Sequence, residues 1–125
     1  MKAANAGPAA VAAAGVTAVL LGAFGAHALS GHLAAQAMSV WHTAVDYQFW
    51  HALALALTAF AAPPGGARAV ALRAFGIGIV FFSGSLYALA LGAPHWIGVI
   101  TPLGGLALII GWVALGLALR ARAAP

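Results

Sequence analysis

Four long apolar runs, almost free of charge, constrain this chain more than any other feature of its sequence. They cover about residues 9–28, 43–62, 70–91 and 97–119. Each is close to the ~20 residues that a helix needs to cross the hydrocarbon core of a bilayer. Because lipid offers no hydrogen-bond partner to the backbone, runs of this length should be helical. The sequence predicts an all-α integral membrane four-helix bundle with short loops, a single transmembrane domain over residues 1–125.

Charged residues are scarce and exclude several classes of function. Only 5% of the 125 residues are charged, whereas soluble domains carry about a quarter. The single acid, Asp46, excludes mechanisms and metal sites that need two carboxylates. With no cysteine in the sequence, disulfides, thiol catalysis and cysteine-ligated metals are excluded as well. Five scattered basic residues cannot form a nucleic-acid-binding stripe, so the expected partner is the lipid bilayer and not a nucleic acid.

Turn-forming residues separate the apolar runs but leave two boundaries open. The Pro-Pro-Gly-Gly sequence at residues 63–66 cannot continue a helix and predicts a tight turn. The last helix could begin only at Thr101-Pro102, in which case residues 94–100 form an apolar loop at the membrane surface. Residues 30–42 have an amphipathic pattern. They predict either an outer-side segment between the first two helices or an extension of the second helix.

The basic residues predict the orientation of the chain. With the N-terminus inside, all of them fall on the cytoplasmic side: Lys2, Arg68, Arg73, Arg120 and Arg122. By the positive-inside rule, this predicts a multi-pass protein of the inner (cytoplasmic) membrane with both termini cytoplasmic. Asp46, most histidines and an interfacial belt of Trp41, Trp50 and Trp96 then lie toward the outer side. A less favoured alternative is a cleaved signal peptide that ends near residue 28.

Small residues recur in the apolar runs and predict close helix packing. In lipid, small side chains let helix backbones approach each other and gain dispersion contacts. We expect this role for Gly22, Gly25, Gly76, Gly84, Gly104, Gly105 and Gly111. The main interpretation is packing within one bundle, and the alternative is a homo-oligomer that forms through one such face.

Polar side chains inside apolar runs are costly in lipid and therefore mark the candidate site. The candidates are His27, Tyr47, Gln48, His51, Ser83, Ser85 and Tyr87. Three interpretations stay open. They are a buried polar cluster that hydrogen-bonds the helices, a haem or metal site that uses His27 and His51, and a polar-ligand, quinone or proton site. No catalytic set or cofactor-binding motif accompanies these residues, so we expect no cofactor and no resident metal.

Several runs of residues also carry a family resemblance. They are residues 21–29, 47–55, 82–89 and 101–105, followed by Gly111-Trp112. In these runs the chain resembles the YgdD-type family of small membrane proteins, the domain of unknown function 423. The resemblance implies a four-span inner-membrane protein and no particular activity, substrate or cofactor. The matching positions are Gly22, Gly25, His27, Tyr47, Gln48, His51, Ser83, Gly84, Ser85, Tyr87, Pro102, Gly104 and Gly105.

These observations favour a non-enzymatic role. The expected function is that of a structural or accessory membrane protein, as a homo-oligomer or as an assembly partner in a larger membrane complex. The alternative is a binding or transport module for a small ligand, lipid, quinone, haem or metal, with a polar site open to the outer side. A cavity lined by His27, His51 and Tyr87 would favour that alternative.

Overall fold

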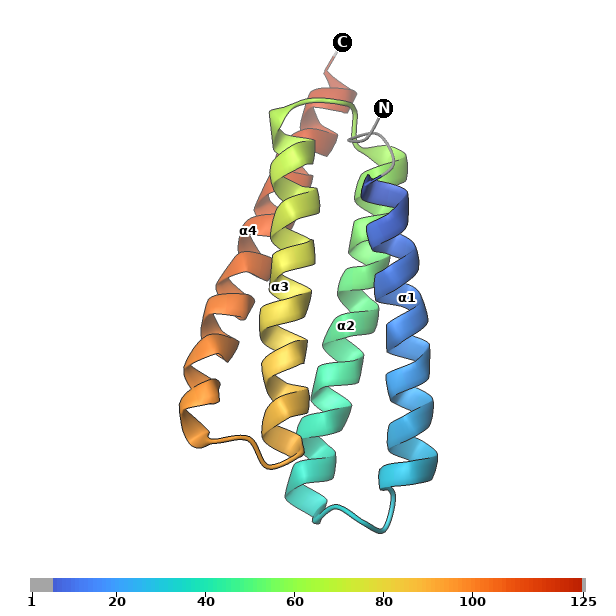
Figure 1. Cartoon of the computed structure of the whole chain (residues 1–125). Helices are drawn as coiled ribbons and strands as arrows, with labels where there is room; N and C mark the ends of the chain where they lie inside the picture. Colours follow the sequence, from blue (N-terminus) through green and yellow to red (C-terminus); the bar gives the residue numbers. More distant parts are fainter. Residues whose placement is uncertain (1–5, 125) are drawn as a thin grey trace.

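The computed structural model describes residues 6–124, which form four long helices. The long helices are α1 (Ala6–Phe24), α2 (Ala35–Ala61), α3 (Gly66–Ala90) and α4 (Ile100–Ala123). Two short helices join them, the π-helix η1 (Gly25–Leu29) and the 3-10 helix η2 (His95–Val99). Successive long helices run in opposite directions, so both ends of the chain lie at the same end of the molecule (Figure 1). The predicted all-α class is confirmed for the described residues, which contain no strand.

Three of the helical stretches are long and apolar enough to cross a membrane. They are Gly7–Leu29, Gly66–Ala90 and His95–Ala123, which include the short helices η1 and η2. The remaining long helix, α2, carries Asp46, Gln48 and His51 in its middle turns, and these lower its mean hydropathy. Length and composition alone therefore identify three candidate spans, and α2 is distinguished from them by its polar residues.

The structure settles the two boundaries that the sequence left open. Residues 35–42 form the first turns of α2, so the amphipathic pattern extends the second helix and makes no separate segment. Ala, Gln and Met dominate these turns and are good helix formers. The last long helix begins at Ile100, and the residues before it form the 3-10 turn His95–Val99 instead of a loop. At the N-terminus, α1 begins at Ala6, which places Pro8 in the first turn, where its missing N–H costs nothing.

The end of α3 and the end of α2 are capped by different means. After α3, Gly92 adopts a left-handed φ of 96°. Its N–H donates to the Leu89 carbonyl at 3.1 Å, and the Ala93 N–H donates to the Ala88 carbonyl at 2.9 Å. This pair of bonds is the Schellman arrangement, which satisfies carbonyls that the helix leaves free.

The C-terminal carbonyls of α2 receive arginine side chains from two other helices. Arg68 Nη2 donates to the Ala59 carbonyl at 3.1 Å, and Arg122 Nη1 donates to the Ala61 carbonyl at 3.0 Å. Cations are favoured at this position because the helix dipole makes the C-terminus partly negative. The two contacts tie the start of α3 and the end of α4 to the end of α2.

The long helices stand in an open row in chain order (Figure 1). α1 packs against α2, α2 against α3 and α3 against α4. Among the described residues, α1 and α4 do not approach each other, so the closing contact of a square four-helix bundle is absent. The predicted bundle is therefore opened out, with α1 and α4 at its two edges and α2 and α3 in the middle.

The closest helix packing lies between α3 and α4 and depends on glycine. A β-carbon at Gly104 would lie 2.8 Å from the carbonyl carbon of Phe81 in the α3 backbone. A β-carbon at Gly111 would lie 2.7 Å from the Phe75 ring. Gly78, on α3, makes a third such contact with the Leu108 side chain. Each helix thus places a glycine where the other helix has a bulky group. Such close packing is expected in lipid, where the hydrophobic effect does not drive helices together.

The glycines predicted to pack divide into three groups. Gly25, Gly104 and Gly111 leave no room for a β-carbon, whereas Gly22 and Gly105 make only ordinary contacts. Gly76 and Gly84 have no atom within 4 Å of a β-carbon position and face open space. Packing of the last two against another helix of the same chain is not observed.

We expect Gly104→Ala to destabilise the protein. The new methyl group meets backbone of α3, which cannot rotate away, and such overpacking costs about 1–3 kcal/mol. The measurement is thermal unfolding in detergent, followed by circular dichroism, where a loss of several degrees in Tm is expected. Gly84→Ala is the matched control, because its position is open and alanine favours a helix. Equal Tm values for the two variants would contradict the packing argument.

Candidate functional site

The buried polar side chains lie on the two middle helices. On α2 they are Gln48, His51 and Thr58, and on α3 they are Ser83 and Ser85. The α2 residues recur at helical spacing, so they share the side of α2 that faces the neighbouring helices. Each of the five side chains has at least one hydrogen-bond partner. The hydrogen bonds of these five buried side chains are therefore made within the protein.

Gln48 joins three helices through one amide group. Its Nε2 donates to the Ala14 carbonyl at 3.1 Å and to the Thr17 hydroxyl at 2.6 Å, both on α1. Its Oε1 accepts a hydrogen bond of 2.7 Å from the Tyr87 hydroxyl on α3. Both amide protons are used, and only 4% of the side chain is exposed. In a bilayer such bonds replace the water that the amide would otherwise need.

A second bond to α1 comes from Trp41. Its indole Nε1 donates to the Leu21 carbonyl at 3.0 Å, and its ring lies 4.6 Å from the Tyr87 ring. Gly25, in the π-helix η1, makes room for the indole, since a β-carbon there would lie 2.6 Å from the ring. Trp41 is 2% exposed, so its predicted place in an interfacial belt is wrong. Trp50 and Trp96 are exposed.

His51 connects α2 to α4. Its Nδ1 lies 2.6 Å from the Tyr47 carbonyl, and its Nε2 lies 3.2 Å from Trp112 Nε1. A carbonyl only accepts and an indole N–H only donates, so the imidazole is neutral with its proton on Nδ1. Both ring nitrogens are thus occupied. A metal ion could bind Nε2 only by displacing the Trp112 N–H.

The two buried serines also bond between helices. Ser83 donates to the Ala44 carbonyl of α2 at 2.7 Å. Ser85 bonds the Thr101 hydroxyl of α4 at 2.6 Å and donates to the Phe82 carbonyl of its own helix at 2.9 Å. No titratable side chain contacts either hydroxyl among these bonds, so neither serine has the base that a nucleophile requires.

The predicted site residues form two clusters, and His27 lies outside both. One cluster surrounds Gln48 and Tyr87, and the other surrounds His51 and Tyr47. His27 is exposed on η1, beyond Trp41. Since Trp41 bonds Leu21 and Gln48 bonds Ala14, the antiparallel register places His27 and His51 on opposite sides of Gln48 along the helix axes. The structure therefore forms no cavity that His27 and His51 share.

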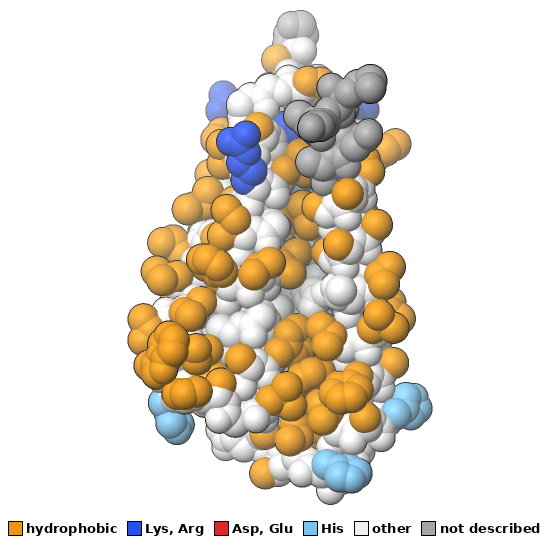
Figure 2. All heavy atoms as spheres, in the orientation of Figure 1, with side chains coloured by type: hydrophobic (Ala, Val, Ile, Leu, Met, Phe, Trp, Pro, Cys, Tyr) orange, Lys and Arg blue, Asp and Glu red, His pale blue; other side chains and the backbone are white. Residues whose placement is uncertain are grey.

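The other histidines mark one end of the molecule. His32, His42 and His95 are exposed, like His27. Figure 2 shows histidine side chains at the end opposite to the Lys and Arg side chains. In the part of the chain that the structure describes, no group of three or more His, Cys, Asp and Glu residues comes together to hold a metal ion.

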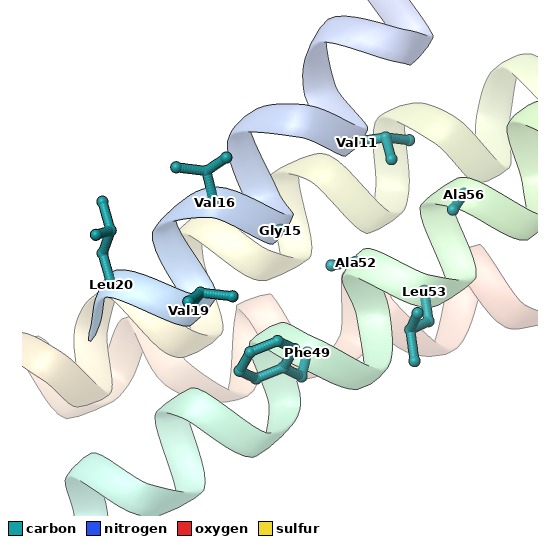
Figure 3. A pocket seen from close by; sticks show the side chains of 9 residues that line it. All are labelled: Val11, Gly15, Val16, Val19, Leu20, Phe49, Ala52, Leu53 and Ala56. Atoms are coloured by element: carbon teal, nitrogen blue, oxygen red, sulfur yellow. The ribbon is translucent and has the colours of Figure 1, made fainter. Parts of the chain in front are cut away.

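Two grooves run beside α2. The aromatic groove, of about 670 Å³, lies between α2 and α4 over Phe82 of α3. Its lining includes Tyr47, Trp50, His51 and Trp112, and the Tyr47 and Phe82 rings are stacked at 4.4 Å. The apolar groove, of about 470 Å³, lies between α1 and α2 and is lined only by aliphatic, small and phenylalanine residues (Figure 3). Of the two, the aromatic groove has the more polar wall, and its lining includes side chains that carry polar atoms, among them Tyr47 and His51.

The sequence missed three partners of the site. The Thr17 hydroxyl accepts a hydrogen bond from Gln48, and the Trp41 indole donates one to the α1 backbone. The Trp112 indole donates one to His51. Thr17 is the one polar side chain in the middle of the first apolar run, and that isolation is the signal that could have identified it. Trp112 carries no such signal, because its partner lies 61 residues away and depends on how α4 packs.

We expect Gln48→Met to lower stability while keeping the size of the side chain. The change removes two donors to α1 and leaves the Tyr87 hydroxyl without its acceptor, a loss of about 1–2 kcal/mol. Thermal unfolding in detergent should show a lower Tm, and Gln36→Met, at an exposed position of the same helix, should not. Because the two groups share one bond, Tyr87→Phe should cost less in the Gln48→Met background than alone. Strictly additive losses would contradict the bond.

Comparison with known proteins provides a family for this chain. Residues 21–105 match the family described as "Protein of unknown function (DUF423)". The UPF0382 membrane protein YwdK of Bacillus subtilis is 46% identical over 102 residues, which cover 78% of this chain and 82% of YwdK. The UPF0382 membrane protein of Haemophilus influenzae is 44% identical over 84% of this chain and 86% of its own length.

A more distant relative agrees with these matches. The UPF0382 inner membrane protein YgdD of Escherichia coli is 37% identical over 103 residues, which cover 78% of this chain and 76% of YgdD. No solved structure matches the chain. The resemblance seen in the sequence is therefore confirmed, and the chain belongs to the DUF423 (UPF0382) family of membrane proteins.

Proposed function

We propose that this chain is a four-span membrane protein whose function is structural or accessory, without catalysis of its own. One observation carries the proposal: the buried polar side chains of the middle helices all bond within the protein. Gln48, His51 and Ser83 each link two or more helices. Groups that an enzyme would keep free for a substrate are used here to hold the row together.

The surface of α2 supports its assignment as the fourth span. Its 27 residues extend about 40 Å, enough to cross a bilayer. Its polar side chains Gln48 and His51 are buried, while its outward face presents apolar residues to the surroundings. The exposed members of that face are Trp50, Leu53, Leu57 and Phe60. Gln48 and His51, which lower the mean hydropathy of α2, would therefore not meet lipid, whereas Asp46 is exposed on the outward face one turn before Trp50.

The charge distribution supports the orientation. The basic side chains lie at the end of the molecule that also holds both chain termini (Figure 2). They come from the first turns of α3 and the last turn of α4, and are Arg68, Arg73, Arg120 and Arg122. Lys2 lies outside the described residues. With this end in the cytoplasm, the chain obeys the positive-inside rule and both termini are cytoplasmic. The E. coli relative YgdD is named an inner membrane protein, and we assign the same membrane to this chain.

The open row favours a role in assembly. α1 and α4 each have one close neighbour and expose apolar side chains along their free faces. Those faces can contact lipid, a second copy of the chain or another subunit. Within the proposal, they are the surfaces through which a homo-oligomer or a larger membrane complex would form.

A second candidate function is the binding of a small membrane-soluble molecule in the aromatic groove. The observation that favours it is the aromatic wall of the groove, in which Tyr47 lies against His51 and its side chain takes part in no hydrogen bond among the described residues. A volume of about 670 Å³ lies within the usual range of small-molecule sites, and aromatic walls suit a flat ring such as a quinone. A haem or metal site on His27 and His51 has no comparable support, because the two residues lie apart.

The orientation can be tested by cysteine labelling, since the chain contains no cysteine of its own. Single cysteines at Ser30, Pro64 and Ala124 would be treated with a membrane-impermeant maleimide in intact cells. We expect labelling of the Ser30 variant alone, and of all three after permeabilisation. Labelling of the Ser30 and Pro64 variants from the same side would contradict a membrane-spanning α2. Labelling of the Ala124 variant in intact cells would contradict the cytoplasmic C-terminus.

Substitution of His51 separates the two candidate functions. If His51 is a structural link, His51→Ala lowers the Tm in detergent by several degrees, because it removes the bonds to Trp112 and Tyr47. His42→Ala, at an exposed site on the same helix, is the control and should leave the Tm unchanged. An unchanged Tm for both variants would contradict the structural role. Native mass spectrometry of the wild type would support the second candidate if a small molecule were retained and then lost in Tyr47→Phe.

A further inference from the structure

A second polar cavity lies at the arginine end of the molecule and shares no lining residue with the aromatic groove. It is bounded by the start of α1, the start of α3 and the underlying part of α2, and its volume is about 380 Å³. Arg68 and Arg73 line it, together with the apolar side chains of Ala10, Leu55 and Leu72. We call it the arginine cavity. None of the roles derived above uses it.

Arg68 lines this cavity and has one hydrogen-bond donor without a partner. Its Nη2 caps α2 by donating to the Ala59 carbonyl, but its Nε is buried and has no partner. A buried donor without an acceptor costs about 1–3 kcal/mol, and more when it belongs to a charged group. Because the Nε atom is covered in this arrangement, an acceptor oxygen in the cavity recovers this cost only if the Arg68 side chain turns toward it. Phosphate oxygens are suited to the fork of an arginine side chain.

The local charge favours an anion. Arg68, Arg73, Arg120 and Arg122 all lie at this end, and the sequence contains a single acid. That acid, Asp46, is 15 residues from the end of α2, about 22 Å along the helix. Among the described residues, no side-chain carboxylate is therefore near enough to neutralise the arginines of the cavity.

The apolar part of the cavity distinguishes a lipid from a free ion. Leu55, Leu72 and Ala10 form its inner wall, which a small hydrated ion would leave uncovered. We propose that the arginine cavity binds an anionic glycerophospholipid. Its phosphate accepts hydrogen bonds from Arg68 and Arg73, and its first acyl carbons lie against Leu55 and Leu72. Basic pockets between membrane helices on the cytoplasmic side are suited to such head groups.

The test uses the purified full chain in a non-ionic detergent. Phosphatidylglycerol is titrated against phosphatidylcholine and against inorganic phosphate, and bound lipid is counted by native mass spectrometry alongside the Tm. Phosphatidylglycerol should stay bound and raise the Tm, while the other two should not. Arg73→Gln should weaken phosphatidylglycerol binding about fivefold, the loss expected for one arginine near an anionic lipid.

Two comparisons make the result decisive. Arg73 is exposed and carries none of the bonds that join the helices, so Arg73→Gln should keep the wild-type Tm in phosphatidylcholine. Arg120→Gln removes an equally exposed cation at the same end that does not line the cavity, and it should bind phosphatidylglycerol like the wild type. Equal weakening in both variants, or equal binding of the two lipids, would overturn the site. Equal stabilisation by inorganic phosphate would overturn the lipid assignment.

Discussion

This structure depends on one constraint, which is that a bilayer offers no water to polar groups on its helices. In lipid the chain gains little from burying apolar surface, and every polar group inside must find a partner in the protein. α2 meets this constraint most visibly. It buries an amide, an imidazole and a hydroxyl, and neighbouring helices or its own backbone satisfy each of them. The least apolar of the four long helices thus has one of the two middle places in the row.

The two edges of the row are attached by different physical means. α1 is held to α2 by side-chain bonds from Trp41 and Gln48, and few of its residues are fully buried. α4 is held to α3 by glycines that admit Phe75, Leu108 and the α3 backbone at short range. Hydrogen bonds fix a register at points, whereas continuous packing resists separation along the whole helix. We therefore expect α1 to be the edge that detaches at lower cost.

The sequence was sufficient for the helical class, the turn at residues 63–66 and the burial of Gln48 and His51, because these follow from local composition and from the cost of polar groups in lipid. It could not assign partners. Gln48 bonds Thr17 and Tyr87, and His51 bonds Trp112, across separations of 31 to 61 residues. Helical phase alone also failed for Gly76 and Gly84, since a small residue can as readily face lipid as another helix. Both the hydrogen-bond partners and the glycines that face another helix depend on the open row. That arrangement is set by all four helices together.

Exposed apolar surface does not identify a functional site in such a protein, because lipid covers it at no cost. The α1–α2 groove, of about 470 Å³, is as large as many ligand sites, and yet its apolar lining contains nothing that would select one molecule over an acyl chain. Polar atoms without a partner are more informative, since each adds a cost that folding alone does not remove. The aromatic groove and the arginine cavity differ in this respect: among the described residues only Arg68 Nε, beside the arginine cavity, is a buried polar atom without a partner, whereas Tyr47 in the aromatic groove is half-buried. They lie at different depths and differ in charge, so a neutral ring and an anionic head group could occupy the protein together without competing.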